Sequence, residues 1–192
     1  MIIIFYINIL FYNDYKLRSQ SFTISNLFNM SSIFELYELA KIKDTEDNFL
    51  LFLKTNKGYL KKRDSSLRTL LHNASSYGNI ELVKAILQLK CDDSYINCGD
   101  NTNHRALHLA ILRGHFEIVK ILHQYGARLD LHTTPYKWSV LHCAAYSGNE
   151  SIISYLFKYG VCDSITTDGI KALKIANTHW SKSKPHVVEL FK

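Results

Sequence analysis

Three histidines recur at near-constant spacing along the chain, and histidine is a residue type that serves as a general base or a metal ligand. Each stands in the pattern Leu-His-x-Ala, and the intervals are 36 and 34 residues: His72, His108 and His142. A zinc ion needs several ligands within about 2.3 Å, whereas equivalent residues of stacked helices are about 10 Å apart. We therefore predict that these histidines share no metal ion.

The cysteines and the common catalytic motifs give no indication of an enzyme. None of the four cysteines belongs to a Cys-x-x-Cys pair: Cys91, Cys98, Cys143 and Cys162. Cys143 follows His142, but neighbouring residues of a helix point to different sides, so its thiol lacks a base. The sequence has no phosphate-binding loop, dinucleotide fingerprint, zinc-protease motif or nucleophile elbow. We predict a non-enzymatic protein without cofactor, metal or small-molecule substrate, with reduced thiols, in the cytoplasm or the nucleus.

Each histidine begins a segment of constant length. A glycine follows the alanine of each motif by four residues, at Gly78, Gly114 and Gly148, and a second apolar helix is predicted after it. The end of this second helix lies 18 residues after the histidine in all three units, whereas the distances from that end to the histidine position of the next unit are 18, 16 and 14 residues. Helix pairs of constant length joined by variable loops are typical of repeat proteins, whose stacked units share one core.

These motifs resemble the ankyrin-repeat family, whose unit has about 33 residues and carries T-P-L-H-x-A at its first helix. The resemblance covers about residues 35–192 and includes E-[LI]-V-K in the second helix, at residues 81–84 and 117–120. It implies an all-α solenoid of stacked helix-turn-helix units with loop or β-hairpin fingers. It also implies that the three histidines are structural, each one hydrogen-bonding between repeats.

The chain departs from the family pattern at the start of the first helix. Thr69 and Ser139 match the threonine of the motif and can cap a helix, whereas Arg105 and Lys171 cannot. The proline of the motif is absent from all four units. We therefore expect the stability of this chain to depend more on stacking between units.

The repeat pattern predicts the domain organisation. We expect residues 1–29 to be an unstructured or wrongly assigned extension, with Met30 as the native start, and residues 30–192 to form one domain. Its units are a degenerate N-terminal unit at about 35–66, full repeats at about 67–102, 103–136 and 137–168, and a C-terminal capping unit at about 169–192. The alternatives for the extension are packing onto the domain, or targeting and membrane association through residues 2–12, a stretch too short to span a bilayer.

The resemblance places partner binding at the loop tips and on the concave face of the first helices, at positions that the motif leaves free. Several of these positions hold residue types that are enriched at binding hot spots. The predicted partner-binding residues are Arg68, Tyr77, His104, Leu112, Arg113, Tyr136, Trp138, Tyr146 and Ile170.

The leading functional prediction is a monomeric, non-enzymatic scaffold or adaptor that binds a folded protein. Residues 39–60 and 63–88 also resemble the start of gankyrin-type proteasome assembly chaperones, which implies a proteasomal ATPase subunit as the partner. A regulatory module of a larger enzyme complex and a membrane-tethered adaptor are alternatives. The net charge of +6 leaves one more alternative, a nucleic-acid-associated protein that binds through residues 61–63 and the lysine-rich C-terminal end.

Overall fold

The computed structural model describes residues 40–41, 44–89, 92–162, 170–180 and 182–191. The predicted extension 1–29, its alternatives and the proposed start at Met30 all lie outside these residues. Among the residues that are described, no helix combines the length and the apolar composition that crossing a membrane requires.

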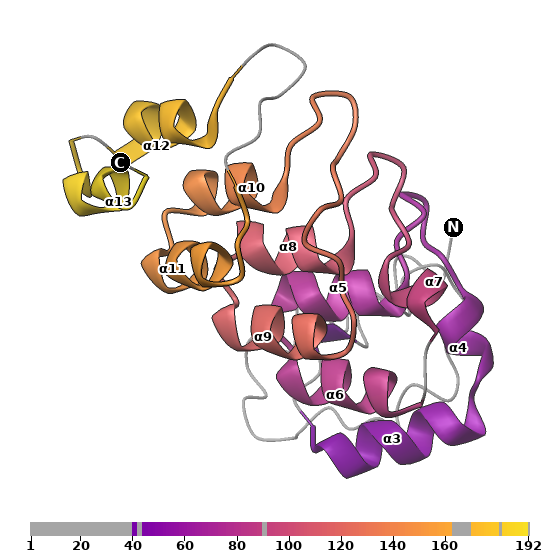
Figure 1. The fold of residues 1–192 in the computed structure, drawn as a ribbon. Helices are drawn as coiled ribbons and strands as arrows, with labels where there is room; N and C mark the ends of the chain where they lie inside the picture. Colours follow the sequence, from indigo (N-terminus) through magenta and orange to yellow (C-terminus); the bar gives the residue numbers. More distant parts are fainter. Residues whose placement is uncertain (1–39, 42–43, 90–91, 163–169, 181, 192) are drawn as a thin grey trace, which may run out of the picture.

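The described residues form helix pairs that are stacked in chain order (Figure 1). Helix α3 (Glu46–Thr55) packs against α6 at the N-terminal end of the stack, and two short helices, α4 (Gly58–Lys61) and α7 (Asp93–Ile96), lie in connections. The four pairs are α5 (Leu70–Tyr77) with α6 (Ile80–Gln88), α8 (Ala106–Leu112) with α9 (Phe116–Gln124), α10 (Val140–Ser147) with α11 (Glu150–Lys158), and α12 (Ala172–Trp180) with α13 (Pro185–Glu189). The prediction of an all-α solenoid is confirmed.

A glycine followed by asparagine makes the turn between the two helices of a pair. Gly78 ends α5 in the left-handed conformation (φ 75°), and the Asn79 side chain then accepts a hydrogen bond from Leu82 N and caps α6. Gly148 and Asn149 repeat this arrangement between α10 and α11. Glycine is required twice over at these positions, because it adopts this conformation without strain and because a Cβ on Gly78 would lie 2.7 Å from the ring of His115.

The two helices of a pair are buried to different extents. The inner helices α5, α8 and α10 lie between neighbouring units and bury most of their residues, including the motif leucines Leu71, Leu107 and Leu141. The outer helices bury one face, as in the Leu82, Val83 and Ile86 face of α6. Each fully buried aliphatic side chain contributes about 1.5–3 kcal/mol, so the shared core supplies the stability that a single pair lacks.

Three loops, called fingers below, precede α5, α8 and α10. A backbone hydrogen bond closes the base of each finger, from Asp64 N to Arg68 O (3.0 Å), from Asp100 N to His104 O (2.9 Å) and from Thr133 N to Trp138 O (3.0 Å). Successive fingers are also joined, from Asn101 N to Ser66 O and from Thr134 N to Thr102 O. In these three segments no β-strand forms, so the fingers are loops rather than β-hairpins.

The three motif histidines link neighbouring units, as the family resemblance implies. Each ring is buried, and its Nε2 donates to a backbone carbonyl in the segment that precedes the next inner helix: His72 to His104 O (3.0 Å), His108 to Leu131 O (3.2 Å) and His142 to Ile170 O (2.9 Å). Nδ1 accepts from the backbone amide three residues earlier, that of Thr69, Arg105 or Ser139. These bonds require the neutral ring, and burial lowers the pKa of His72 to about 4 and that of His108 to about 3.

A second row of hydrogen bonds, which the sequence did not predict, links the units at the other end of the inner helices. In each unit a side chain at or just after the glycine position donates to a carbonyl of the preceding unit. The bonds run from Asn79 Nδ2 to Ala40 O (3.1 Å), from His115 Nε2 to Ser76 O (3.2 Å), from Asn149 Nδ2 to Gly114 O (3.2 Å) and from Trp180 Nε1 to Ala145 O (2.8 Å). The recurrence of a polar side chain immediately after the glycine was the available signal.

Arg105, which does not match the motif, links loops through its side chain. Its guanidinium donates to three carbonyl oxygens, from Nη1 to Asn103 O (2.6 Å) and His132 O (2.6 Å) and from Nε to Asn97 O (3.3 Å). The side chain thus connects the finger before α8 to the segment that leads to the next finger. The hydroxyl cap is lost here as predicted, but the guanidinium offsets the loss by holding these loops together.

Candidate functional site

The predicted partner-binding residues fall into two rows along the stack, which together are called the inner surface below. One row is on the fingers and just before the inner helices, and the other is at the C-terminal ends of the inner helices. The first row holds Arg68, His104, Tyr136, Trp138 and Ile170, and the second holds Tyr77, Leu112, Arg113 and Tyr146.

These residues differ in how much surface they offer. Tyr136 is 57% exposed, Tyr146 46% and Tyr77 37%, and Arg113 is also exposed. By contrast, three of the predicted residues are half-buried and pack against the core: Leu112, Trp138 and Ile170. The exposed tyrosines and Arg113 are therefore the side chains that are best placed to contact another molecule.

The C-terminal half of the inner surface carries an aromatic group. The ring centroids of Trp138 and Tyr146 are 5.8 Å apart, and the edge of the His179 ring packs on Tyr146 at 4.9 Å. His179 was not among the predicted residues, because the fourth unit lacks the histidine and glycine of the motif. Its position could have been found by counting, since His179 stands six residues after Leu173, as Tyr77 stands six residues after Leu71.

The N-terminal half of the inner surface is basic and polar. Arg68 Nε lies 3.1 Å from Asp100 Oδ2, and the Asp100 carboxylate is fully buried and also accepts from Thr102 N and His104 N. Burial alone would raise the pKa of Asp100, but the hydrogen bonds from Thr102, His104 and Arg68 outweigh it and hold this pKa below its ordinary value. Asp100 therefore stays charged and fixes the finger and the Arg68 side chain.

Three of the predicted residues meet around one hollow in this basic half. The hollow lies at the ends of α5 and α8 and is lined by Arg68, Asn73, Ser76, Tyr77 and Arg113. Arg68 and Arg113 are 45 residues apart in the sequence, and stacking of the two units brings them to the same hollow. It offers hydrogen-bond donors and positive charge to a ligand.

Two features of the described residues bear on metal binding and on thiol chemistry. Within the described part of the chain, no group of three or more His, Cys, Asp or Glu side chains could hold a metal ion. Cys143 is completely buried, and burial raises the pKa of its thiol to about 12, so the nucleophilic thiolate does not form near neutral pH. The inner surface instead offers charge, hydrogen bonds and aromatic rings, which are the means of non-covalent recognition.

The stacked helix pairs, the fingers and the histidine links together define a helical-repeat protein. Comparison with protein families identifies the repeat: a model of three consecutive ankyrin repeats matches residues 36–133, and a model of a single ankyrin repeat matches residues 136–168. The chain belongs to the ankyrin-repeat family. The search of curated proteins found no match. Ankyrin repeats are in general non-enzymatic modules that bind other proteins, and membership indicates protein partners for this chain.

Proposed function

We propose that this chain is a monomeric, non-enzymatic scaffold that binds a folded partner protein through its inner surface. The chief support is a row of exposed side chains at the C-terminal ends of successive inner helices: Tyr77 and Arg113, each at the end of its helix and directly before the glycine, and Tyr146, one position earlier in its unit. The core and the two rows of hydrogen bonds hold the stack together, and these side chains belong to neither. A preformed surface of this kind binds with little loss of conformational entropy.

A three-residue variant tests the proposal. Tyr77→Ser, Arg113→Gln and Tyr136→Ser remove exposed side chains of the inner surface while leaving half-buried Trp138 in place. The full-length chain and the variant would each be tagged and expressed in the native cells, and captured proteins would be quantified by mass spectrometry. We expect capture of the specific partner to fall at least about tenfold, because hot-spot residues contribute more than about 1 kcal/mol each.

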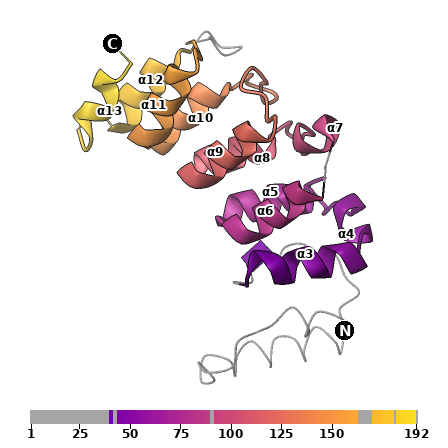
Figure 2. The ribbon, with the colours of Figure 1, turned by 60° about the horizontal axis from the view of Figure 1, so that its bottom comes forward.

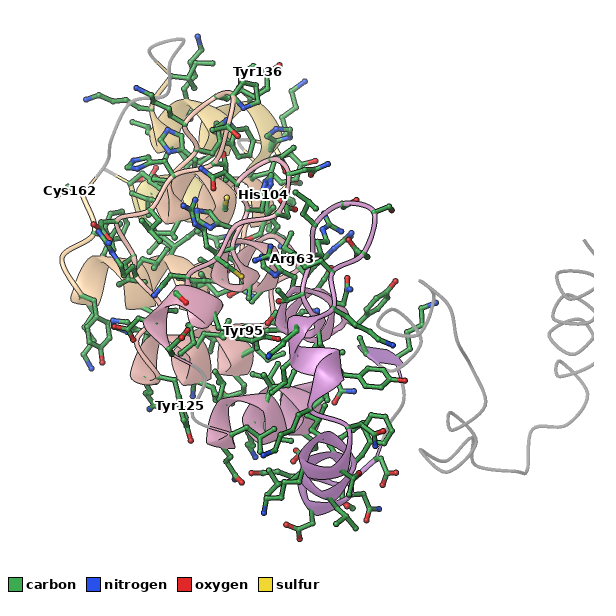
Figure 3. The ribbon with its side chains drawn as sticks, turned by 90° about the vertical axis from the view of Figure 1, so that its right-hand side faces the viewer. Arg63, Tyr95, His104, Tyr125, Tyr136 and Cys162 are labelled. Atoms are coloured by element: carbon green, nitrogen blue, oxygen red, sulfur yellow. The ribbon has the colours of Figure 1, made fainter. Side chains whose placement is uncertain are left out.

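The control carries the same types of substitution away from the inner surface: Tyr125→Ser, Arg128→Gln and Tyr159→Ser. The two tyrosines are 45% and 51% exposed and lie at the ends of outer helices α9 and α11. Figure 3 shows Tyr125 well apart from Tyr136. The control should capture the partner like the unmodified chain. Equal capture by all three proteins, with unchanged circular dichroism, would refute the proposal.

The proteasome-chaperone prediction is a more specific form of the same proposal. It names the C-terminal domain of a proteasomal ATPase subunit as the partner and rests on the sequence of residues 39–60 and 63–88. Those residues include α5 and α6 and part of the basic half of the inner surface, with Arg68 and Tyr77 but not Arg113. Capture of such a subunit that is lost in the inner-surface variant would support it, whereas a different partner lost in the same way would support only the general proposal.

A further inference from the structure

We propose that the hollow at the ends of α5 and α8 binds the carboxylate of an aspartate or glutamate side chain of the partner protein. The hollow is lined by Arg68, Asn73, Ser76, Tyr77 and Arg113. This inference rests on the proposed function, because the acidic residue belongs to the protein that the inner surface binds. It extends that function by assigning a chemical group to the half of the surface formed by α5 and α8.

Two guanidinium groups of the hollow have donors to spare. The exposed Arg113 guanidinium forms no hydrogen bond or ion pair with any residue in the described part of the chain. Arg68 uses Nε to bind Asp100 (3.1 Å), and neither of its Nη groups has a partner within the same described residues. A guanidinium is planar and binds a carboxylate through two parallel N–H groups. Both arginines can therefore donate hydrogen bonds to one carboxylate bound in the hollow.

The acidic groups nearest to the hollow are already occupied. The Asp100 carboxylate is fully buried and accepts from Arg68, Thr102 and His104. Asp64 accepts from the amide of Arg68 through Oδ1 (2.9 Å) and from the Asn73 side chain through Oδ2 (3.3 Å). Both carboxylates thus hold the fingers in shape and do not neutralise Arg113.

The remaining groups around the hollow also suit an anion. Helix C-termini repel negative charge, but the Ser76 carbonyl oxygen near the end of α5 already accepts a hydrogen bond from His115 Nε2 (3.2 Å). Lys41 Nζ lies 5.5 Å from the centre of the Tyr77 ring and adds positive charge at this edge. The hollow is open to solvent, so we expect weak binding of an isolated carboxylate and use of the site as one anchor within a larger interface.

Arginine side-chain NMR tests the inference without knowledge of the partner. The full chain, with the Nε–Hε signals of Arg68 and Arg113 assigned, would be titrated to millimolar concentration with acetyl-Ala-Glu-Ala-amide, with acetyl-Ala-Gln-Ala-amide and with inorganic phosphate. We expect both signals to shift and saturate with the glutamate peptide and to stay in place with the glutamine peptide. Arg113→Gln should weaken the binding seen at Arg68 about fivefold or more. Arg128→Gln, which removes an arginine paired with Asp130 at the surface, is the matched control and should leave the binding unchanged.

Three results would overturn the inference: equal shifts with the glutamine peptide, no saturable shift with the glutamate peptide, or tighter binding of phosphate, which would make the hollow a phosphate site. The outcome is separate from that of the capture experiment. If the glutamate peptide does not bind but the inner-surface variant still loses its partner, the inference fails and the proposed function holds. If the glutamate peptide binds but partner capture is the same for the inner-surface variant, the hollow binds a carboxylate and the proposed function fails.

Discussion

The buried histidines make the stability of the stack depend on pH, and the size of the effect can be calculated. Burial lowers the pKa of His72 from 6.5 to about 4 and that of His108 from 6.5 to about 3. Both rings are neutral in the folded protein, so protons bind the unfolded chain more readily. The stabilisation is therefore complete above about pH 6.5 and is lost as the pH falls below it.

Between pH 7.5 and about pH 5, each of the two histidines should lower the free energy of unfolding by about 2 kcal/mol. Each pH unit below the pKa of the unfolded state contributes about 1.36 kcal/mol. The combined loss is about 4 kcal/mol, which is a large part of the 5–15 kcal/mol that stabilises a typical domain. The value hardly depends on the native pKa values, because at this pH a folded-state pKa of about 4 or lower leaves the ring almost unprotonated.

The assay is urea unfolding at the two pH values for the unmodified chain and for the double variant His72→Gln, His108→Gln. The variant is less stable at both pH values, but its free energy of unfolding should fall about 4 kcal/mol less on acidification. His179→Gln, at an exposed position, is the control and should follow the unmodified chain. The reasoning is wrong if the double variant and the unmodified chain lose the same free energy within about 1 kcal/mol. If the variant does not fold, NMR can follow the ring protons of the unmodified chain, and titration of His72 or His108 above pH 5 would contradict the reasoning equally.

Three further predictions concern other residues. Leu67 is 51% exposed and its backbone is in the left-handed conformation (φ 60°). The substitution Leu67→Gly should relieve about 1–2 kcal/mol of backbone strain, which exceeds the entropy cost of glycine, about 0.5–1 kcal/mol. A lower melting temperature of the variant would contradict this. Arg105→Ala should destabilise the chain by about 1–3 kcal/mol in urea unfolding, and Arg105→Lys should restore less than half of that, because an ammonium cannot reach three carbonyls. In native protein the exposed thiol of Cys162 should react with a maleimide and the buried thiol of Cys143 should react only after unfolding, as mass spectrometry of labelled peptides would show.

The arrangement of the stack explains why such local changes affect the stability of the whole chain. Each inner helix is joined to its neighbours at both ends, by a histidine toward the next unit and by a side chain near the glycine toward the preceding one. Figure 2 shows the units in succession, with α3 and α13 toward opposite ends. Since the units of a solenoid are stabilised by contacts with their neighbours, the loss of one link weakens one interface directly and the rest of the stack through it.

The repeat, the helix pairs and their buried faces can be predicted from the amino-acid sequence alone. The helical period places Leu82, Val83 and Ile86 on one face of α6, and that face is buried. Gly78 and Gly148 end their helices in the left-handed conformation that the pattern predicts. These features depend on residues a few positions apart, so the local pattern is sufficient to predict them.

Contacts between residues of different units become visible only in the folded stack. The acceptor of the His108 ring, the three carbonyls bound by Arg105 and the hollow shared by Arg68 and Arg113 all join distant residues. The sequence predicted that Arg68 and Arg113 belong to the same surface but not that they line one hollow. It also did not indicate His179. The physical reason is that such contacts depend on the distance between stacked helices and on the path of connections of unequal length, and the repeat period specifies neither.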